Sequence, residues 1–233
     1  MTSGTQIQML MRDMLFINWA IDPDAARRFV DRRLELDTVM ASAGKRMAFA
    51  SAVCFRVDEV RSSVLPLPRL SFEQVNYRIY VKAEDVPSVV FLDMKVNSRM
   101  VTTLTSFLRV PVSYEDIDIK AEPAGPESLR YVFESSGLHA DVTVGGEAIV
   151  PDPAIEPAFI TQRLTGYAGA GDSMYRIDVQ HPLLDARPAR VAGVEAPTLV
   201  GLGLLTVEES RWAHSAMYVR EALFGTSPPA RAW

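Results

Sequence analysis

Four polar side chains alternate along the apolar segment 72–81, and they are the residues of this chain best placed for chemistry. Successive side chains of a β-strand point to opposite faces, so Gln74, Asn76, Arg78 and Tyr80 share one face. The guanidinium of Arg78 is a fork of N–H donors that a carboxylate accepts in pairs. We expect this face to line a hollow that takes a small polar or anionic ligand, with exposure to solvent as the simpler alternative.

A second polar row follows on the next predicted strand. Asp93, Lys95 and Asn97 alternate there, and Arg99 follows at the start of a predicted helix. Two neighbouring strands would then present amide, carboxylate and cationic groups to one common space. The residues assigned to ligand binding are Gln74, Asn76, Arg78, Lys95 and Arg99.

Proton transfer requires groups that gain and lose a proton within reach of the ligand. His181, followed by Pro182 at the end of a predicted strand, is the best histidine for that role, although structural histidines are more frequent. His139 and His214 are given no role. The residues assigned to proton transfer are Tyr80, Tyr114, Tyr175 and His181.

Motifs for other chemistries are absent from the sequence. The three histidines lack metal-ligand spacing, and no HExxH or paired-cysteine motif accompanies them, so we expect no bound metal. The glycine-rich run 166–171 lacks the Lys-Thr or Lys-Ser of a phosphate loop, and no GxSxG motif indicates a serine hydrolase. The acidic run 115–118 is typical of a solvated edge. We expect no cofactor.

Composition excludes several classes of protein. Of the 233 residues, 48% are hydrophobic and 23% are charged, which is enough apolar surface for a core. A formal net charge of -5 argues against a nucleic-acid partner, because binding phosphates needs clustered Lys and Arg. No segment approaches the ~18 to 20 apolar residues that span a bilayer, and the N-terminus lacks the features of a signal peptide. We expect a cytoplasmic protein in which Cys54 is buried and inert.

Helix signals are few and short. Asp22 can cap a helix over 25–34 with Pro23 at its first position, and Ser98 can cap a second helix that ends before Pro111. A third helix begins near Pro157. Strand patterns are more numerous and cover residues 47–57, 72–81, 88–96, 129–133, 138–144, 174–181, 199–207 and 215–219.

The order of these elements predicts an α+β fold, a single, mostly antiparallel, β-barrel-like domain with about three short helices. Short junctions at 135–137 and 145–146 favour antiparallel hairpins over the helical crossovers of a parallel sheet. We find no linker long enough to divide the chain, so residues 1–224 form one domain. Residues 225–233 are predicted to be a flexible tail.

Short motifs scattered over roughly residues 9–223 resemble the YqjF-like family of uncharacterised proteins. In chain order the motifs are Asn18-Trp19, Asp22-Pro23, Val75-Asn76-Tyr77-Arg78-Ile79-Tyr80-Val81, Phe91-Leu92-Asp93, Ser98-Arg99, Phe159-Ile160-Thr161-Gln162-Arg163 with Tyr167, Tyr175, His181-Pro182, and His214-Ser215 with Tyr218 and Arg220. The resemblance implies the acetoacetate decarboxylase-like superfamily, whose fold is one antiparallel barrel-like domain around a small-molecule cavity. It also favours the inward direction for Gln74, Asn76 and Arg78.

The departures from that superfamily concern its mechanism. The decarboxylases form a Schiff base through a lysine in a Pro-Lys-Lys segment, where this chain has Pro111-Val112-Ser113. Their strand glutamate is replaced by Gln74, which cannot act as a general acid or base. Lys95 could in principle supply an amine from a neighbouring strand, but an isolated strand lysine is more often a surface residue in an ion pair. Classical acetoacetate decarboxylation is therefore disfavoured.

Two main readings of the function remain. The first is a small-molecule enzyme, of the lyase, isomerase or cyclase type, acting on a carbonyl or carboxylate compound without a Schiff-base lysine. The second is a non-catalytic binding or sensor protein that uses the same cavity. A structural protein with a filled barrel is a third alternative, and self-association into a homo-oligomer is left open by the sequence.

Overall fold

Long apolar segments form the central strands of the fold. The computed structural model describes residues 7–40, 44, 46–62, 70–107, 110–145, 156–169 and 171–233. In the strand β1 (Ile7–Ile21), residues 14 to 19 are buried on both faces, and the same holds for residues 48 to 55 of β4 (Arg46–Ser62). Strands covered on both faces read as continuous apolar runs instead of alternating ones. No strand is predicted at β1, although its apolar run is of the same kind as that of β4, for which a strand is predicted over 47–57.

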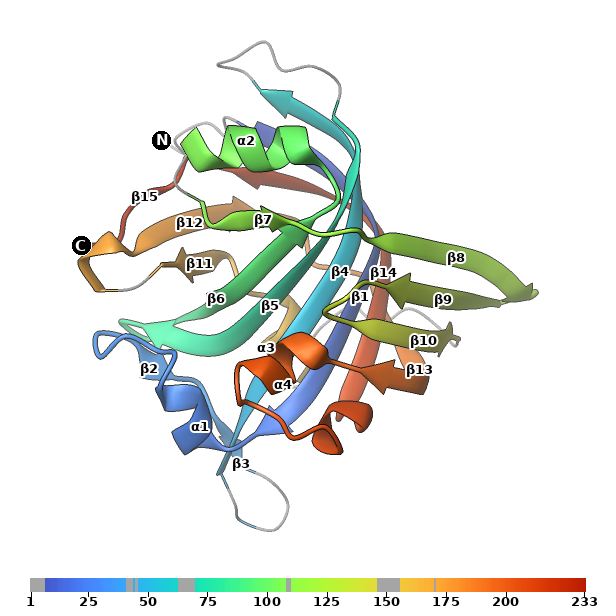
Figure 1. Cartoon of the computed structure of the whole chain (residues 1–233), viewed down its shortest axis with the longest axis horizontal. Coiled ribbons are helices and arrows are strands. Elements are labelled where there is room, and N and C mark those ends of the chain that lie inside the picture. The colour runs from blue at the N-terminus through green and yellow to red at the C-terminus, as the bar shows by residue number, and fades with distance from the viewer. Residues whose placement is uncertain are drawn as a thin grey trace.

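Backbone pairing links seven of these strands in a closed circuit, since β12 pairs with both β11 and β14. All pairings in the circuit are antiparallel except that of β6 with β11, so the mostly antiparallel, barrel-like prediction is confirmed. Figure 1 shows the sheet curling around its concave side. The strands of the circuit, besides β1 and β4, are β5 (Phe72–Ala83), β6 (Val86–Val96), β11 (Thr165–Ala168), β12 (Tyr175–Gln180) and β14 (Ser215–Thr226).

A second layer of strands is joined to the circuit by the pairing of β13 with β14. It consists of β13 (Ala186–Glu195), β10 (His139–Val144), β9 (Ser128–Glu134) and β8 (Asp118–Gly125), which pair in that order. The predicted hairpin at 135–137 joins β9 to β10, whereas the predicted junction at 145–146 lies partly outside the described residues. The remaining short strands are β2 (Glu35–Leu36), β3 (Val39–Met40), β7 (Val112–Tyr114) and β15 (Ala230–Arg231).

The two faces of the circuit pack into separate buried clusters. The inner core, on the concave side, contains Phe16, Phe49, Phe55, Tyr80 and Met217. The outer core lies between the circuit and the second layer and contains Trp19, Cys54, Tyr77, Tyr131 and Phe133. Cys54 is fully buried, and burial raises the pKa of its thiol well above the ordinary value.

Four α-helices occur among the described residues. α1 (Pro23–Arg27) begins as predicted, with the carboxylate of Asp22 accepting from the Asp24 amide at 2.7 Å, but it ends well before residue 34. α2 (Arg99–Phe107) follows Ser98, and α3 (Glu156–Thr161) covers the third predicted position. The predicted strand at 199–207 is wrong. Pro197 starts α4 (Pro197–Gly201) there instead, and its buried Leu199 packs in the outer core.

The last residues of the chain have defined partners. β15 pairs with β12, and the Trp233 ring stacks on Tyr167 with 5.9 Å between the ring centroids. The predicted mobility of residues 225–233 stays untested, as does the domain boundary at residue 224.

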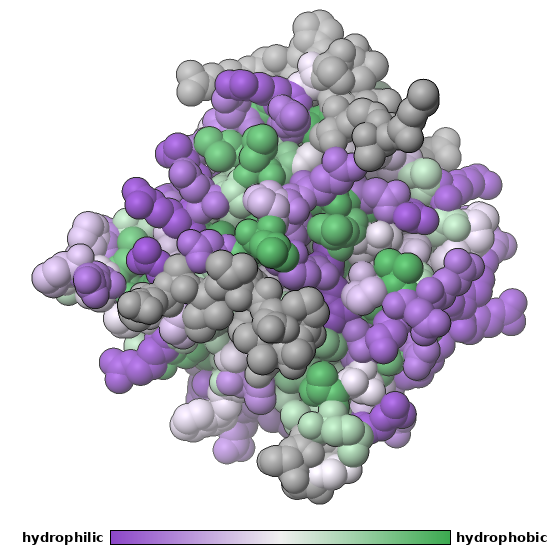
Figure 2. Space-filling model, turned by 180° about the vertical axis from the view of Figure 1, so that it is seen from behind, coloured by the Kyte–Doolittle hydropathy of each residue, from purple (hydrophilic) through white to green (hydrophobic). Residues whose placement is uncertain are grey.

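The surface seen from behind is of mixed polarity. Figure 2 shows hydrophilic residues interspersed with small hydrophobic patches on that face of the described chain. Such a mixture is ordinary for a folded domain, and self-association stays a prediction. None of the described helices has the length and apolar character needed to cross a bilayer.

Candidate functional site

A row of buried polar groups crosses the inner face of the circuit. Ser51 lies directly beside Arg78 in the pairing of β4 with β5. Its hydroxyl donates to Oδ1 of Asn18 at 2.5 Å and lies 2.6 Å from the hydroxyl of Tyr80. Asn18 donates onward to the Ser215 hydroxyl at 3.1 Å. Asn18, Ser51 and Tyr80 are each fully buried, so this row is an enclosed hydrogen-bond network.

Arg78 ends this network on the inner side of β5. Its Nη2 donates to the hydroxyl of Tyr80 at 3.3 Å and to the main-chain carbonyl of Ile160 at 2.8 Å. Its guanidinium carbon lies 5.5 Å from the centroid of the Phe16 ring. Nε of Arg78 is buried and has no hydrogen-bond partner among the described residues. The side chain therefore lies on the inner face, as the alternation of β5 predicts.

His181 follows β12 on the far side of the circuit and is close enough to Arg78 to feel its charge. Burial, and secondarily the charge of Arg78, lower the pKa of His181, against the opposing effect of its hydrogen bond to the Pro182 carbonyl. Nδ1 lies 2.7 Å from that carbonyl oxygen, which only accepts, so Nδ1 carries the hydrogen. In the neutral ring Nε2 is then the unprotonated nitrogen, which is the form that acts as a base.

Gln74 and Asn76 extend the polar row along β5. The Gln74 side-chain amide donates to Oδ1 of Asn76 at 2.6 Å, and both side chains are partly buried. Gln74, Asn76, Arg78 and Tyr80 thus share the inner face of β5, and the His181 ring contacts Phe224 of the inner core, with 4.7 Å between the ring centroids.

Lys95 does not join them. Val75 pairs with Lys95, and Tyr77 pairs with Asp93, so these polar residues share the face of the outer core. The Lys95 ammonium binds the Ser113 hydroxyl at 2.9 Å and the Asp93 carboxylate at 3.1 Å. The expectation of a space shared with Arg78 is corrected by the register, which alternation within a single strand does not reveal.

Tyr114 and Arg99 form a separate contact at the edge of the circuit. The Arg99 guanidinium carbon lies 4.2 Å from the centroid of the Tyr114 ring, and the Tyr114 hydroxyl donates to the Asp116 carboxylate. Tyr114 is exposed. These two predicted residues contact each other but not the inner polar row.

Tyr175 lies at the opposite end of β12 from His181. Alternation gives it the face of Val179, which packs against the inner core. His181 lies six positions after Tyr175, which corresponds to roughly 20 Å of extended chain. Tyr175 therefore lies on the face of the inner core, but at the end of β12 that is far from His181.

A buried ion pair that the sequence did not single out lies next to the row. Arg163 donates from Nη1 to Asp37 at 2.7 Å, and their side chains are only 2% and 8% exposed. Nε of Arg163 donates to the Phe159 carbonyl at 2.6 Å, and the Phe159 ring contacts that of Tyr80, with 5.1 Å between centroids. Arg163 therefore anchors α3 against the inner core. Its place in the motif Phe159-Ile160-Thr161-Gln162-Arg163 was the available signal.

The described lysines all have polar partners. Lys82 shares the face of Arg78 by alternation, and its ammonium lies 3.5 Å from Asp37, while Lys120 pairs with Asp118 on the surface. At the segment where the decarboxylases carry lysines, Val112 packs against the inner core and Ser113 accepts from Lys95. Within the described part of the chain, no three His, Cys, Asp or Glu side chains form a group that could hold a metal ion.

Comparison with known proteins supports the fold. Residues 8–220 match the family described as "Uncharacterized conserved protein (COG2071)". No curated protein matches the chain by sequence. Among solved structures, the enduracididine biosynthesis enzyme MppR, in complex with the condensation product of pyruvate and imidazole 4-carboxaldehyde, is 12% identical with a TM-score of 0.64, covering 98% of this chain and 90% of its own.

Two further structures are similar to the same extent. MppR in complex with pyruvate has a TM-score of 0.61 at 12% identity, covering 99% of this chain and 91% of its own. Acetoacetate decarboxylase from Legionella pneumophila subsp. pneumophila str. Philadelphia 1 has a TM-score of 0.63 at 9% identity, covering 98% and 90%. At such identities the likeness concerns the fold alone, and the predicted acetoacetate decarboxylase-like fold is confirmed.

Proposed function

The chain belongs to the YqjF-like family of uncharacterized conserved proteins, and from that premise we propose that it is a small-molecule enzyme that binds a 2-oxo acid on the inner face of its barrel-like sheet. The observation that carries the proposal is the buried, unpartnered Nε of Arg78. The superfamily fold is compatible with such a site, since structural neighbours are enzymes and one of them is in complex with pyruvate.

The guanidinium of Arg78 supports an anionic ligand. Its bonded acceptors, the Ile160 carbonyl and the Tyr80 hydroxyl, are both neutral, and it makes no ion pair with a described carboxylate. A cation held in a protein interior without an anion is costly, and a bound carboxylate lowers that cost. A bound carboxylate would accept a hydrogen bond from Nε, since both hydrogens of Nη2 are engaged by the Ile160 carbonyl and the Tyr80 hydroxyl.

His181 supports proton transfer at the bound ligand. In the proposed step, Nε2 of His181 removes a proton from the carbon next to the ketone, and the electron pair of that C–H bond moves into the ketone oxygen. The positive charge of Arg78 stabilises the resulting enolate. Return of the proton restores the keto acid, and attack of the enol carbon on a second carbonyl compound extends the same chemistry to a condensation. No Schiff base is required.

A binding or sensor function is the second candidate. Tyr80 is already hydrogen-bonded to Ser51, and the Gln74 and Asn76 amides are bonded to each other, so three of the five residues in the row are occupied within the protein. Amides and an arginine bind an anion without moving protons. In this second candidate, Arg78 still binds the anion, but His181 transfers no proton.

Exchange of the methyl protons of pyruvate in deuterated water separates the two candidates. We expect saturation-transfer NMR to detect binding, and proton NMR to show loss of the methyl signal faster than in buffer. His181→Gln should abolish the exchange and leave binding, whereas the matched control His139→Gln, at a surface residue paired with Glu134, should exchange normally. Binding without exchange by the wild type would favour the sensor, and absence of both would refute the proposal.

A further inference from the structure

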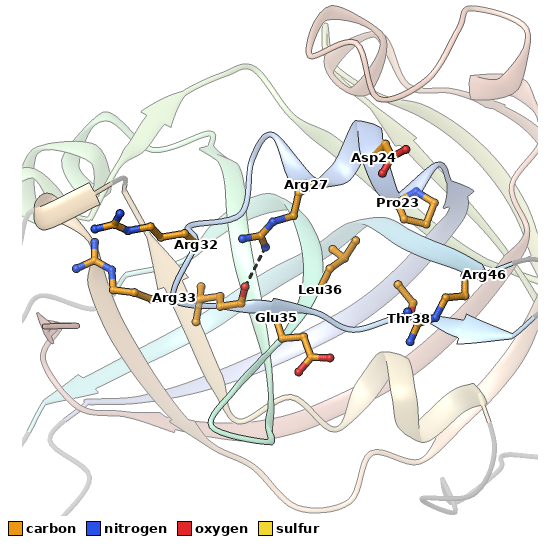
Figure 3. Close-up of a pocket in the computed structure, with 10 residues that line it drawn as sticks. Pro23, Asp24, Arg27, Arg32, Arg33, Glu35, Leu36, Thr38 and Arg46 are labelled. Carbon is orange, nitrogen blue, oxygen red and sulfur yellow. Dashed lines mark hydrogen bonds between the residues drawn. The ribbon is translucent and has the colours of Figure 1, made fainter.

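The cleft where α1 passes over β2 is large, but its charged side chains are spread along it. It has a volume of about 520 Å³. Figure 3 shows Arg32 at one end and Arg46 at the other. Arg27 lies between them, and both of its terminal nitrogens donate to main-chain carbonyls. These side chains therefore do not converge on a common ligand.

A smaller pocket lies at the end of β1, against the segment that follows α4. Its volume is about 370 Å³, which falls within the ~300 to 1,000 Å³ of small-molecule sites. Its lining includes Trp19, Leu205, Glu208, Glu209, Trp212 and His214. None of these belongs to the polar row on β5, so the pocket is separate from the site proposed at Arg78.

Hydrogen bonds hold the frame of this pocket in place. The indole N–H of the buried Trp19 donates to the Ser210 carbonyl at 3.1 Å, which ties β1 to the 3₁₀ turn Glu209–Arg211. Thr206 and Glu209 form a capping box, in which Oε2 accepts from the Thr206 amide at 2.7 Å and the Thr206 hydroxyl accepts from the Glu209 amide at 3.1 Å. A frame built in this way is preorganised, which lowers the entropic cost of binding.

The pocket has an excess of negative charge. No Lys or Arg belongs to the lining formed by the described residues. Glu208 is exposed and forms no ion pair with a described residue. Hydrogen bonds from the amide and then the hydroxyl of Thr206 lower the pKa of Glu209, so its carboxylate is charged at neutral pH. Arg211, the nearest cation along the chain, is paired with Glu195 at 2.9 Å.

Trp212 adds an aromatic face that the fold leaves open. The residue is 76% exposed, and its indole makes no hydrogen bond, ring contact or cation contact with a described residue. Glu208 and Trp212 flank the turn Glu209–Arg211 and line the same pocket. The face of an indole attracts positive charge through its quadrupole, and an adjacent carboxylate adds to that attraction.

We propose that this pocket is a second ligand site, which binds a small organic ammonium ion against Trp212, Glu208 and Glu209. The positive charge of such an ion is attracted by the two carboxylates, and its alkyl groups pack on the indole. The apolar Trp19 and Leu205 in the lining suit those alkyl groups, whereas a hard metal ion prefers a shell of oxygen ligands. The net charge of -5 further favours the approach of a cation.

Choline and its uncharged analogue dimethylbutanol test the site, because carbon replaces the ammonium nitrogen in the second compound and the shape is kept. In proton–nitrogen NMR spectra, choline should shift the indole N–H signal of Trp212 and leave that of Trp233, which lies elsewhere against Tyr167. Dimethylbutanol should cause no comparable shift. Trp212→Phe assigns the signal by removing it.

Variants separate the two parts of the site. Glu208→Gln should bind choline at least about 3-fold more weakly than the wild type, because it removes the charge and keeps the shape. The matched control Glu127→Gln removes the same charge from the exposed turn between β8 and β9, outside the pocket, and should keep wild-type affinity. Trp212→Leu should lose detectable binding, and Trp212→Phe should retain part of it.

Three outcomes would overturn the proposal. Equal weakening in Glu208→Gln and Glu127→Gln would indicate only long-range attraction by the net charge. Binding of dimethylbutanol as tight as that of choline would show a merely apolar pocket, and wild-type protein without a shift at millimolar choline would show no site. Melting curves establish that the variants are folded, since Glu208 and Trp212 are exposed.

Discussion

Arg78 donates from Nη2 to the main-chain carbonyl of Ile160 at 2.8 Å, and this bond ties the strand β5 to the helix α3 inside the circuit. Ile160 lies in the last turn of α3 (Glu156–Thr161), where carbonyl groups lack an intrahelical partner. The guanidinium therefore completes the end of a short helix, and its buried Nε has no hydrogen-bond partner among the described residues. At the proposed site, ligand binding would be coupled to the position of α3 through this one side chain.

Replacing Arg78 separates its two roles. Arg78→Gln should abolish detectable pyruvate binding and lower the free energy of unfolding by about 1 to 3 kcal/mol, because the Ile160 carbonyl is left unsatisfied. Ligand titration followed by NMR and urea denaturation measure the two effects. A variant that loses stability without any change in pyruvate binding would identify Arg78 as a structural residue only.

His181 should make the fold sensitive to mild acid. Its pKa is lowered from the ordinary value of 6.5, so as the pH falls below that value the unfolded chain takes up a proton before the folded chain does. Stability is therefore present above this window and decreases as the pH falls through it. Between about pH 8 and about pH 5, His181→Gln should lose less stability than the wild type.

The pKa of His181 also measures its interaction with Arg78. Since the charge of Arg78 contributes to the lowered pKa, the pKa of His181 should rise in Arg78→Gln, as followed by the imidazole proton shifts in NMR titration. His139→Gln, with its surface histidine, is the control for the denaturation series. An unchanged pKa of His181 in Arg78→Gln would mean that the two groups do not interact.

Borohydride reduction in the presence of pyruvate tests the absence of a Schiff base. Lys95 lies on the outer face with Ser113 and Asp93, and the ammonium of Lys82 is engaged by Asp37, so we expect no covalent adduct by mass spectrometry. An adduct that maps to either lysine would contradict the proposed mechanism. Lys82→Arg and Lys95→Arg then show which amine reacts.

The polar row on β5 was predictable because it needs only the two-residue period of a strand. Gln74, Asn76 and Arg78 do share a face, and Tyr80 joins them. Asn18 and Ser51, which complete the network, are single polar residues within apolar runs, and that is a signal the sequence contains. A polar side chain in a segment buried on both faces must find a partner there.

Register between strands was beyond prediction from one sequence. Lys95 and Arg78 lie on opposite faces because Val75, and not Gln74, pairs with Lys95. Shifting the pairing by one residue would reverse that result, and no local pattern determines it. His181 approaches Arg78 only because β12 closes the circuit with β14, a contact between segments distant in sequence.

Cys54 should be inert in the folded protein. It is fully buried in the outer core, and burial raises the pKa of its thiol, so the reactive thiolate is disfavoured at neutral pH. A thiol reagent such as dithionitrobenzoate should label the protein only after denaturation. Rapid labelling under native conditions would show that the outer core opens at Cys54.

Two tyrosines of β5 provide a matched test of the inner network. The hydroxyl of Tyr80 bonds to Ser51 and accepts from Arg78, whereas that of Tyr77 is buried in the outer core beside Thr198 without a hydrogen bond of good geometry to any described residue. Tyr80→Phe should lower the free energy of unfolding by about 1 to 3 kcal/mol, because it leaves the buried polar groups of Ser51 and Arg78 without this hydrogen-bond partner. Tyr77→Phe should be nearly neutral or stabilising, because it removes a polar atom that folding leaves unsatisfied.

Urea denaturation of both variants measures the difference, since each removes a single oxygen from a buried ring on the same strand. The effect of removing a hydroxyl group is common to both variants, so the difference in their free energies of unfolding gives the contribution of the hydrogen-bond partners of Tyr80. Equal costs for the two substitutions would mean that Ser51 and Arg78 gain nothing from Tyr80. The inner row would then be a set of separate polar groups without the cooperativity that positions Arg78 for a ligand.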